Sequence, residues 1–390
     1  KFVKKMEQLG LRTEKGFAIT GVKAYLNEDK KENASLALLG ELDALRIPEH
    51  AFANPETNAA HCCGHHAQMA GVFGAALALT VPEIAEKLDG QVVFFATPAE
   101  EYGEIEFKNQ LREQGKIRYG GGKCELLRIG AFDDIDLCLT HHIRPGNEIL
   151  VGSGTGNGFV SKVIRVLGKA SHAAGAPEKG VNALSAASLG LQALGLNRET
   201  FRDEDCVRVH PIITKGGNLV NVIPDEVVVE TLVRGKTIEA FTDAAKKTDR
   251  SFKAGAIAMG AKVEISTLPG YLPTLAEEAL PELKHAAEIS ASGIPVIEAS
   301  GHAGGSTDVG DVQHLMPVYT FNTGGVKGGL HQIDFEVTDE EEAYIVTAKM
   351  FALAAYGLLK EKAQRSRELV DQYEPVFKNS AEYVEFMEQF

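Results

Sequence analysis

Side chains that bind transition metals gather at four places in this sequence. They are the stretch His61-Cys62-Cys63-Gly64-His65-His66, the pair Glu100-Glu101, the pair His141-His142, and His331. Imidazole, thiolate and carboxylate groups together suit zinc, manganese or nickel, whereas calcium and magnesium prefer oxygen ligands alone. The adjacent carboxylates suit metal-dependent hydrolysis, because one glutamate can hold an ion while the other takes a proton from water.

Three short apolar runs come directly before polar residues of this kind. The runs are 36–42 before Asp43, 91–97 before Glu100 and Glu101, and 136–140 before His141 and His142. Such near-continuous apolar runs are typical of strands that are buried on both faces. Open α/β sheets build their sites at the carboxyl ends of strands, so the sequence predicts one crevice that contains all three groups.

Each of these residues also has a simpler interpretation. A buried histidine is commonly a hydrogen-bonded core residue, and Cys62 and Cys63 could be two inert buried thiols. Glu100 and Glu101 could form the acidic first turn of a helix after Pro98. We favour a metal site because the candidate ligands coincide at the ends of strands.

The order of the motifs resembles a family of dimetal amidohydrolases. The motifs are His61-x-Cys63-Gly64-His65, Pro98-Ala99-Glu100-Glu101, a His before x-x-Pro145, Ser171-His172-Ala173-Ala174, Asn221-Val222-Ile223-Pro224-Asp225 and Leu330-His331. The family includes hippurate hydrolase, the indoleacetyl-amino-acid hydrolases and aminobenzoyl-glutamate hydrolase, within the aminoacylase and carboxypeptidase G superfamily. The resemblance covers roughly residues 20 to 360, and the segments 269–273 and 305–311 look most like the aminobenzoyl-glutamate branch.

The resemblance implies a general base, Glu100, and two divalent transition-metal ions, which would be zinc, manganese or nickel. The implied metal ligands are Cys63, His65, Glu101, His142 and His331. His142 is preferred to His141 because Ile143-Arg144-Pro145 follows it with the spacing of the family. There are two departures: His66 stands where the family has Asp or Asn, and Glu41 stands where the wider family has a histidine ligand. The roles of His66 and His141 stay open.

The resemblance also implies three residues that act on the substrate. His172 would polarise the scissile carbonyl, in the site of the partner subunit of a homodimer. Asn221 and Arg234 would hold a substrate carboxylate, for which a guanidinium group is the natural bidentate partner. Without the resemblance, the simpler interpretation is that His172 is an ordinary loop histidine, Asn221 part of a tight turn and Arg234 a surface arginine.

The expected fold is α/β, with two domains. A doubly wound, mostly parallel sheet would form a catalytic domain from residues 1–157 and 269–390. An inserted α+β lid and dimerisation domain would occupy residues 158–268, with strands at 160–167, 207–213 and 227–234 and helices at 182–194 and 238–259. The glycines near 152–158 mark a bend between the domains, and their spacing fails the dinucleotide-binding pattern of a nicotinamide dehydrogenase. A capping box at 338–341 predicts a helix over 339–359.

Length and composition agree with this fold. The chain has 390 residues, 44% of them hydrophobic and 24% charged, which is typical of a soluble protein with two domains. The net charge of −14 argues against a nucleic-acid partner, and we expect no apolar run near the ~20 residues of a membrane span. Five cysteines argue for a reducing cytoplasm rather than for a disulfide framework. The start at Lys1, without the first helix and strand of the family, leads us to expect a chain that begins after the true N-terminus.

The sequence thus predicts a cytoplasmic, homodimeric metal-dependent amidohydrolase. It would cleave the amide bond of N-acyl or aminobenzoyl amino acids by a metal-activated water, with Glu100 as general base. A dimetal dipeptidase or carboxypeptidase is the alternative, and it would need a pocket for a free α-amine. A non-catalytic binding paralogue is disfavoured because Glu100 and the ligands are all retained. The expected partner is a small N-acyl amino acid or short peptide, with no nucleic acid and no membrane.

Overall fold

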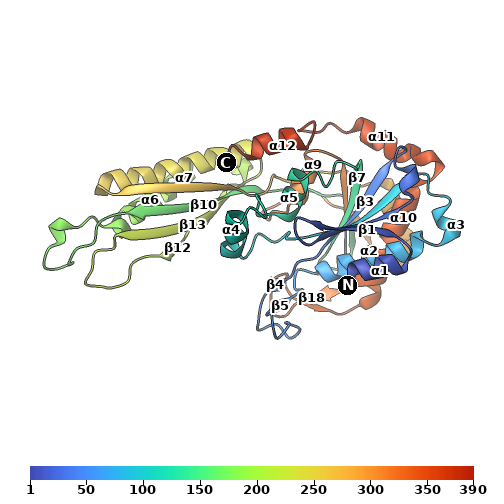
Figure 1. Cartoon of the computed structure of the whole chain (residues 1–390), viewed down its shortest axis with the longest axis horizontal. Coiled ribbons are helices and arrows are strands. Elements are labelled where there is room, and N and C mark those ends of the chain that lie inside the picture. Colours follow the sequence, from blue (N-terminus) through green and yellow to red (C-terminus); the bar gives the residue numbers. More distant parts are fainter. The chain divides into compact units, whose positions relative to one another are not determined.

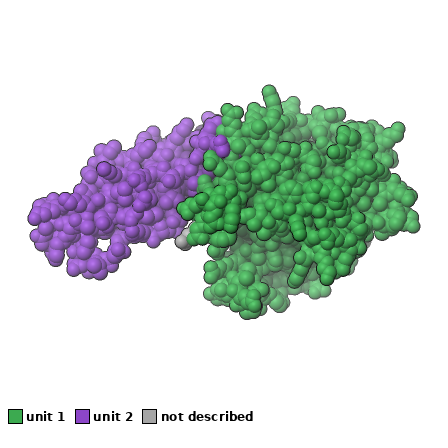
Figure 2. All heavy atoms as spheres, in the orientation of Figure 1, with its two compact units in different colours: residues 1–155, 275–302, 307–386 green, residues 156–274, 303–306, 387–390 purple. Residues whose placement is uncertain are grey.

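A computed structural model describes residues 1–105 and 107–390, and contacts between residues divide the chain into two units (Figure 2). Unit 1 contains Lys1–Thr155, Leu275–His302 and Thr307–Phe386. Unit 2 contains Gly156–Thr274, Ala303–Ser306 and Met387–Phe390. The sequence did not predict that the two short segments Ala303–Ser306 and Met387–Phe390 belong to unit 2. The assignment of these units as a catalytic domain and an inserted lid stays a prediction.

Unit 1 is built on an eight-stranded sheet with the strand order β1-β2-β6-β3-β7-β17-β8-β15. The strands are β1 Arg12–Phe17, β2 Gly21–Leu26, β3 Ser35–Glu41, β6 Gln91–Thr97, β7 Leu137–Ile143, β8 Ile149–Val151, β15 Val296–Glu298 and β17 Val318–Thr323. The four neighbours β6, β3, β7 and β17 are parallel, whereas β2 and β8 run antiparallel to β6 and β17. A mixed α/β fold with a large, mostly parallel central sheet is therefore confirmed.

Helices cover both faces of this sheet. Figure 1 shows α2 (His65–Leu79) and α10 (Thr347–Leu359) on one side, and α5 (Gly122–Arg128) and α9 (Val309–Gln313) on the other. Every residue of β3 and β6 is buried. Strands that are covered on both faces have no polar face, which explains why the sequence shows unbroken apolar runs there.

The other elements of unit 1 surround this core. The helices are α1 Phe2–Gln8, α3 Pro82–Ala85, α4 Ile105–Glu113, α8 Pro281–Ser290, α11 Gln364–Gln372 and α12 Ser380–Met387. The short strands are β4 Leu45–Arg46, β5 Ala59–Ala60, β18 Val326–Lys327 and β19 Glu336–Val337, while β9 Thr155–Gly156 and β16 His302–Ala303 lie at the unit boundaries. Among these elements, α8 packs against α10, and α1 packs against α2.

The helix expected over 339–359 begins differently from the expectation. Residues Glu341–Val346 form π-helical turns, and the regular α-helix starts only at Thr347. The Thr338 hydroxyl donates to the Gly325 carbonyl. The Asp339 carboxylate accepts the Glu342 N–H at 3.0 Å. The capping bond is therefore accepted by Asp339 and not by Thr338, to which the sequence assigned it.

The segment Glu341–Leu359 is the one helix of the described residues that is long and apolar enough to cross a membrane. It has 19 residues, so the expectation that no segment approaches a membrane span overlooked it. Its residues Met350, Phe351 and Leu358 belong to the hydrophobic core of unit 1. Burial of that kind is typical of a central helix in a folded domain.

Unit 2 is an antiparallel sheet that carries two helices. Its elements are β10 Gly158–Leu167, α6 Ala183–Asn197, β11 Arg208–Val209, β12 Ile212–Lys215, β13 Glu226–Gly235, α7 Ile238–Met259 and β14 Lys262–Pro269. The strand order is β11-β13-β10-β14, and β12 also pairs with β13. Burial alternates along β13, because α6 and α7 cover one face of the sheet (Figure 1). The sequence did not predict β14, and it predicted one strand where β11 and β12 are separate.

Candidate metal centre

Cys63 belongs to two groups of side chains that could each hold a metal ion. One group is Cys63, His65 and His142, and the other is Cys63, Glu101 and His331. Within each group, the candidate ligand atoms all lie within 4.8 Å of one another. The Sγ atom of Cys63 is 3.4 Å from His142 Nε2 and 3.2 Å from His331 Nε2. The structure thus brings together all five residues that the resemblance implies as ligands.

Local backbone geometry brings these ligands into range. Gly64 has a φ of 85°, and a Cβ atom there would lie 2.0 Å from the side chain of Ile143. Only glycine therefore allows the chain to turn so that His65 becomes the first residue of α2. His331 also has a left-handed backbone, with φ 63°, and its N–H donates to the Cys62 carbonyl at 2.9 Å. This hydrogen bond holds His331 beside Cys63, although the two are far apart in the sequence.

The two adjacent histidines of β7 have different surroundings. The Nε2 atom of His142 faces Cys63, whereas His141 packs against Phe321 and lies 2.8 Å from the Thr323 hydroxyl through its own Nε2. Burial lowers the pKa of His141 well below its usual value. Side chains alternate across a strand, so only one of two neighbours can face the same group. The structure places His142 in that position.

Two further neighbours of the ligands lie outside both groups. His66 packs edge-on against Phe335 and Tyr344, with ring centroids 6.4 and 5.9 Å away. Burial and the nearby His61 lower the pKa of His66 to about 4. The thiol of Cys62 is buried and donates to the Ala60 carbonyl. Among the described residues, the two groups around Cys63 therefore include Cys63 and His65 from the stretch 61–66, but not Cys62 or His66.

The charges in the centre favour a bound cation. Burial by itself raises the pKa of the Cys63 thiol, but hydrogen bonds with His142 and His331 outweigh it and bring the pKa to about 6. A thiolate is the form of cysteine that binds metals. Burial lowers the pKa of His65, yet Glu41 and Asp43 more than compensate and raise it to about 12. The same carboxylates would attract a metal ion at this place.

Two buried ligand atoms have no hydrogen-bond partner among the described residues. They are His65 Nε2 and Glu101 Oε1. These atoms nevertheless lie 3.2 Å from Glu41 Oε2 and 2.8 Å from His331 Nε2. Short distances without hydrogen-bond geometry are expected when several ligand atoms point at a common position between them. Because buried polar atoms are normally satisfied, this arrangement fits a metal site.

Glu100 adjoins the ligands and a second set of carboxylates. It lies within 4.8 Å of His65 and Glu101, and separately of Glu41 and Asp308, measured between their possible ligand atoms. Burial raises the pKa of Glu100 well above its usual value, and the charges of Glu41 and Asp308 raise it further. A carboxylate with a raised pKa is a stronger base when it is ionised, which suits the role implied for Glu100.

Sequence reasoning missed Lys123, which forms ion pairs with both carboxylates of this second set. Its side chain is fully buried, and Nζ lies 2.5 Å from Glu41 Oε1 and 2.6 Å from Asp308 Oδ1. The run Gly120-Gly121-Gly122 before it could have been a signal of close backbone packing. The structure gives the reason for the last of these, because a Cβ atom at Gly122 would lie 1.5 Å from the Pro98 carbonyl oxygen. Glu41, noted as a departure from the wider family, thus forms an ion pair with Lys123 and is not in either group around Cys63.

Replacing Lys123 with methionine should lower the free energy of unfolding by about 3–5 kcal/mol, since it leaves two buried carboxylates without their cation. Lys284→Met is the matched control, because the ion pair of Lys284 with Glu298 is exposed and should contribute less than about 1 kcal/mol. Urea unfolding of the metal-free proteins, followed by circular dichroism, measures both values. Equal losses in the two variants would contradict this account of Lys123.

The substrate residues implied by the resemblance all lie in unit 2. The Nδ1 atom of His172 accepts the N–H of Gly175 at 2.9 Å, so the neutral ring carries its proton on Nε2. The N–H of Ala173 donates to the Asn221 carbonyl at 2.9 Å, which places the segments of His172 and Asn221 side by side. His172 and Asn221 are both exposed.

Arg234 is held in a fixed position at the end of β13. Its Nη1 atom donates to the Ser306 hydroxyl at 2.5 Å, and its guanidinium carbon lies 5.1 Å from the centre of the Phe159 ring. Burial lowers the pKa of Arg234, so desolvation makes its charge costly and favours an anionic partner. Ser306 comes from one of the short late segments of unit 2, which the sequence did not connect with Arg234.

Comparison with known proteins decides the family. The sequence profile of peptidase family M20/M25/M40 matches residues 37–356. The chain belongs to this family. The match confirms the resemblance drawn from the motifs, and it covers all five candidate ligands, Glu100 and the three residues of unit 2.

Relatives in this family act on different amides. The Xaa-Arg dipeptidase of Mus musculus is 28% identical over 311 residues, which cover 78% of this chain and 64% of the mouse protein. The N-acetyl-L-cysteine deacetylase of Bacillus subtilis is 25% identical, over 94% of this chain and 84% of the deacetylase. The chain thus matches less than two thirds of the length of the mouse dipeptidase.

A solved structure shows the same fold. It is a protein of Bacillus subtilis described as a dinuclear metal-binding peptidase of the M20 family. The TM-score is 0.64 at 23% identity, and the superposition covers 92% of this chain and 90% of that protein.

Proposed function

We propose that this M20-family protein is a metal-dependent amidohydrolase that cleaves the amide bond of N-acyl amino acids. The observation that carries this proposal is the pair of ligand groups that share Cys63, with Glu100 next to both. The relative that deacetylates N-acetyl-L-cysteine supports an acylated amino acid as substrate. We also propose that the protein acts in the cytoplasm, as its cysteine content indicates.

The ligand groups would hold two divalent transition-metal ions. Cys63 belongs to both groups, so its thiolate would bind the two ions together, and zinc, manganese and nickel all accept this mixture of ligands. Bound ions would supply Lewis acidity, which makes water more acidic and polarises a carbonyl group.

The protein residues would move the proton and orient the substrate. Glu100 would take the proton from the attacking water and return it to the leaving amine. The Nε2–H of His172 would donate to the carbonyl oxygen as negative charge develops on it. Asn221 and Arg234 would hold the carboxylate of the amino acid, because a guanidinium group can bind both of its oxygens.

Unit 2 would act as an inserted lid and dimerisation domain, as the sequence predicts for residues 158–268. Its strand β12 and the following loop expose large apolar residues, namely Ile212, Ile213, Leu219 and Val220. Exposed apolar patches of this kind are typical of contacts between protein chains. A homodimer formed through this surface would place His172 near the partner subunit.

The reaction can be tested with metal-loaded protein and matched amides. N-acetyl and N-benzoyl amino acids should release the free amino acid, whereas dipeptides with a free α-amine should react more slowly. The dipeptidase relative of mouse makes Xaa-Arg dipeptides the main competing substrates. Faster cleavage of a free Xaa-Arg dipeptide than of every acylated amino acid would replace the amidohydrolase assignment by the dipeptidase one.

Removing the unit 2 residues should impair catalysis without removing metal. Arg234→Ala should raise KM by about tenfold to a hundredfold, because an ion pair with a buried carboxylate is lost. His172→Ala should lower kcat by about a hundredfold to a thousandfold, as loss of one oxyanion donor does. Arg165→Ala is the control, because Arg165 is an exposed arginine of the same unit that pairs with Glu226. Steady-state kinetics and metal analysis of each variant measure these effects.

The site across the dimer can be examined by mixing two inactive variants. Heterodimers of His172→Ala with Glu100→Gln should regain activity, because one of the two sites then has both residues. No recovery in verified heterodimers would show that each site is completed within one chain.

A further inference from the structure

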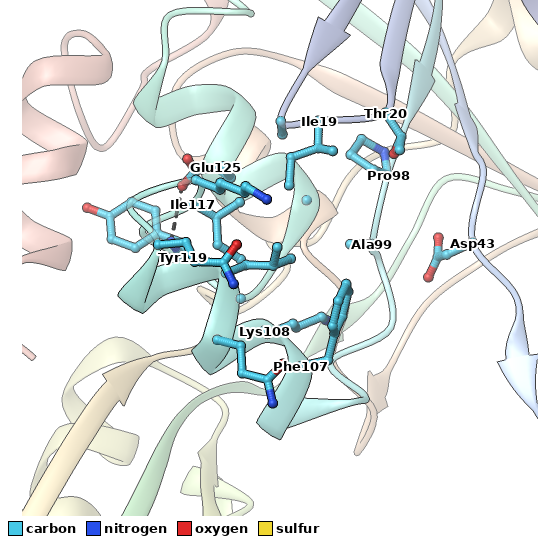
Figure 3. A pocket seen from close by; sticks show the side chains of 18 residues that line it. Ile19, Thr20, Asp43, Pro98, Ala99, Phe107, Lys108, Ile117, Tyr119 and Glu125 are labelled. Atoms are coloured by element: carbon cyan, nitrogen blue, oxygen red, sulfur yellow. Dashed lines mark hydrogen bonds between the residues drawn. The ribbon is translucent and has the colours of Figure 1, made fainter.

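A cavity of about 560 Å³ lies in unit 1. Its walls come from the turn between β1 and β2, the segment after β6, helix α4 and the chain that leads into α5 (Figure 3). Small-molecule pockets typically have volumes of roughly 300–1,000 Å³. We propose that this cavity binds the acyl group of the substrate and selects uncharged apolar acyl groups, aromatic or branched aliphatic. This inference rests on the amidohydrolase function proposed above.

Large apolar side chains line the cavity and remain open to solvent. Ile19, Phe107, Leu111 and Ile117 all contribute to its wall. Ile19 is 48% exposed and Phe107 is 56% exposed. Covering apolar surface of this size stabilises a complex by about 25 cal/mol for each Å² removed from water. An apolar ligand would therefore be favoured here.

The backbone of the cavity wall is strained. Ala18, Ile19 and Ala99 have φ values of 43°, 77° and 53°, all in the left-handed region. This conformation is costly for a β-branched residue such as Ile19, and such strain is often found where a site needs a particular side-chain position. Figure 3 shows the Ile19 side chain at the cavity between Pro98 and Ile117.

The charged side chains of the wall are largely engaged by the protein itself. Lys108 Nζ donates to the Glu101 carbonyl at 2.7 Å, and the Asp43 carboxylate accepts the Glu101 N–H at 2.9 Å. Glu125 accepts the N–H of Tyr119 at 3.1 Å. Because these three groups already have partners, they would add little to the binding of a charged ligand. Lys116, the fourth charged side chain of the wall, is exposed. The cavity thus favours an uncharged group.

The cavity and the metal centre share part of one wall. Asp43 lines the cavity, and its Oδ1 atom lies 3.5 Å from Nδ1 of the candidate ligand His65. Ala99, which also lines the cavity, directly precedes Glu100. Figure 3 shows Asp43 at one end of the cavity and Tyr119 toward the other. A group bound in the cavity would therefore lie next to the proposed reaction centre.

The acyl half of the substrate fits this cavity better than the amino-acid half does. The amino-acid half carries a carboxylate, for which Asn221 and Arg234 of unit 2 are the proposed partners. Of the two cations in the cavity wall, Lys108 is bonded to the Glu101 carbonyl and Lys116 is exposed. The acyl half needs no charge partner, and its carbonyl must lie at the metal centre.

The first test fills the cavity. Ile117→Trp in the metal-loaded full chain should lower kcat/KM for N-benzoyl-alanine by about tenfold or more, because the pocket discriminates by volume. The same variant should change kcat/KM for N-acetyl-alanine by less than about twofold, since an acetyl group does not reach the filled part. Ile129→Trp is the matched control, as Ile129 is 42% exposed and lies outside the cavity wall. Equal losses with both substrates, or no loss with either, would overturn the proposal.

The second test does not depend on hydrolysis. Calorimetry with 2-naphthamide, a neutral aromatic amide, should show binding to the wild type and to Ile129→Trp, and weaker or no binding to Ile117→Trp. If this pattern appears in a protein that hydrolyses neither substrate, the cavity assignment stands and the proposed function fails. No binding to the wild type, or equal binding to all three proteins, would overturn the cavity assignment. Circular dichroism confirms that the variants are folded.

Discussion

Replacing Glu100 with glutamine should lower kcat by about two to four powers of ten and leave the metal content unchanged. Glutamine keeps the size and hydrogen-bonding capacity of the side chain, but it cannot accept the proton from water, and general-base catalysis typically contributes this much. Because Glu100 is outside both groups around Cys63, the ions should keep their ligands. Kinetics with an N-acyl amino acid and metal analysis of the same preparation give the two values.

Glu101→Gln is the control for this experiment, because it makes the same chemical change at the neighbouring residue. Glu101 belongs to a ligand group, and its Oε1 atom lies 2.8 Å from His331 Nε2. An amide is a poorer ligand than a carboxylate, so this variant should lose metal. If Glu100→Gln loses metal while Glu101→Gln keeps both metal and activity, the two roles are reversed or the site is wrong.

The second large effect is expected at Cys63. Cys63→Ala should reduce the bound metal from about two ions per chain to less than about one, because one thiolate serves both ligand groups and alanine offers no replacement. Treatment with EDTA should remove the metal and the activity of the wild type in parallel. Metal analysis after dialysis against metal-free buffer measures the stoichiometry.

Cys62→Ala is the matched control for Cys63→Ala. The two cysteines are adjacent and both buried, but Cys62 donates to the Ala60 carbonyl and is outside both groups. Its removal should therefore leave the metal content unchanged, with at most a small loss of stability from the cavity that it leaves. Equal metal loss in both variants would exclude the assignment of Cys63 as the shared ligand.

Much of the fold was predictable because local patterns and packing agree. The apolar runs at 36–42 and 91–97 became β3 and β6, since strands covered on both faces need unbroken apolar sequence. Helix α7, over Ile238–Met259, was likewise predicted, and it packs one face on the sheet of unit 2. Strand β14 was missed although Lys262-Val263-Glu264-Ile265 alternates polar and apolar residues. The alternation spans only four residues before the polar pair Ser266-Thr267, which is a weak signal for a strand.

The sequence by itself determined which residue types could bind metal and that they follow strands, and the family motifs picked five of them. The tertiary structure decided what linear order cannot show. It showed what His141, whose role the sequence left open, contacts instead: the Thr323 hydroxyl, because side chains alternate across β7 and only His142 faces Cys63. It also revealed Lys123 between Glu41 and Asp308, residues far apart in the chain. Contacts of that kind depend on how helices and strands pack, and a local sequence pattern carries no record of packing between distant segments.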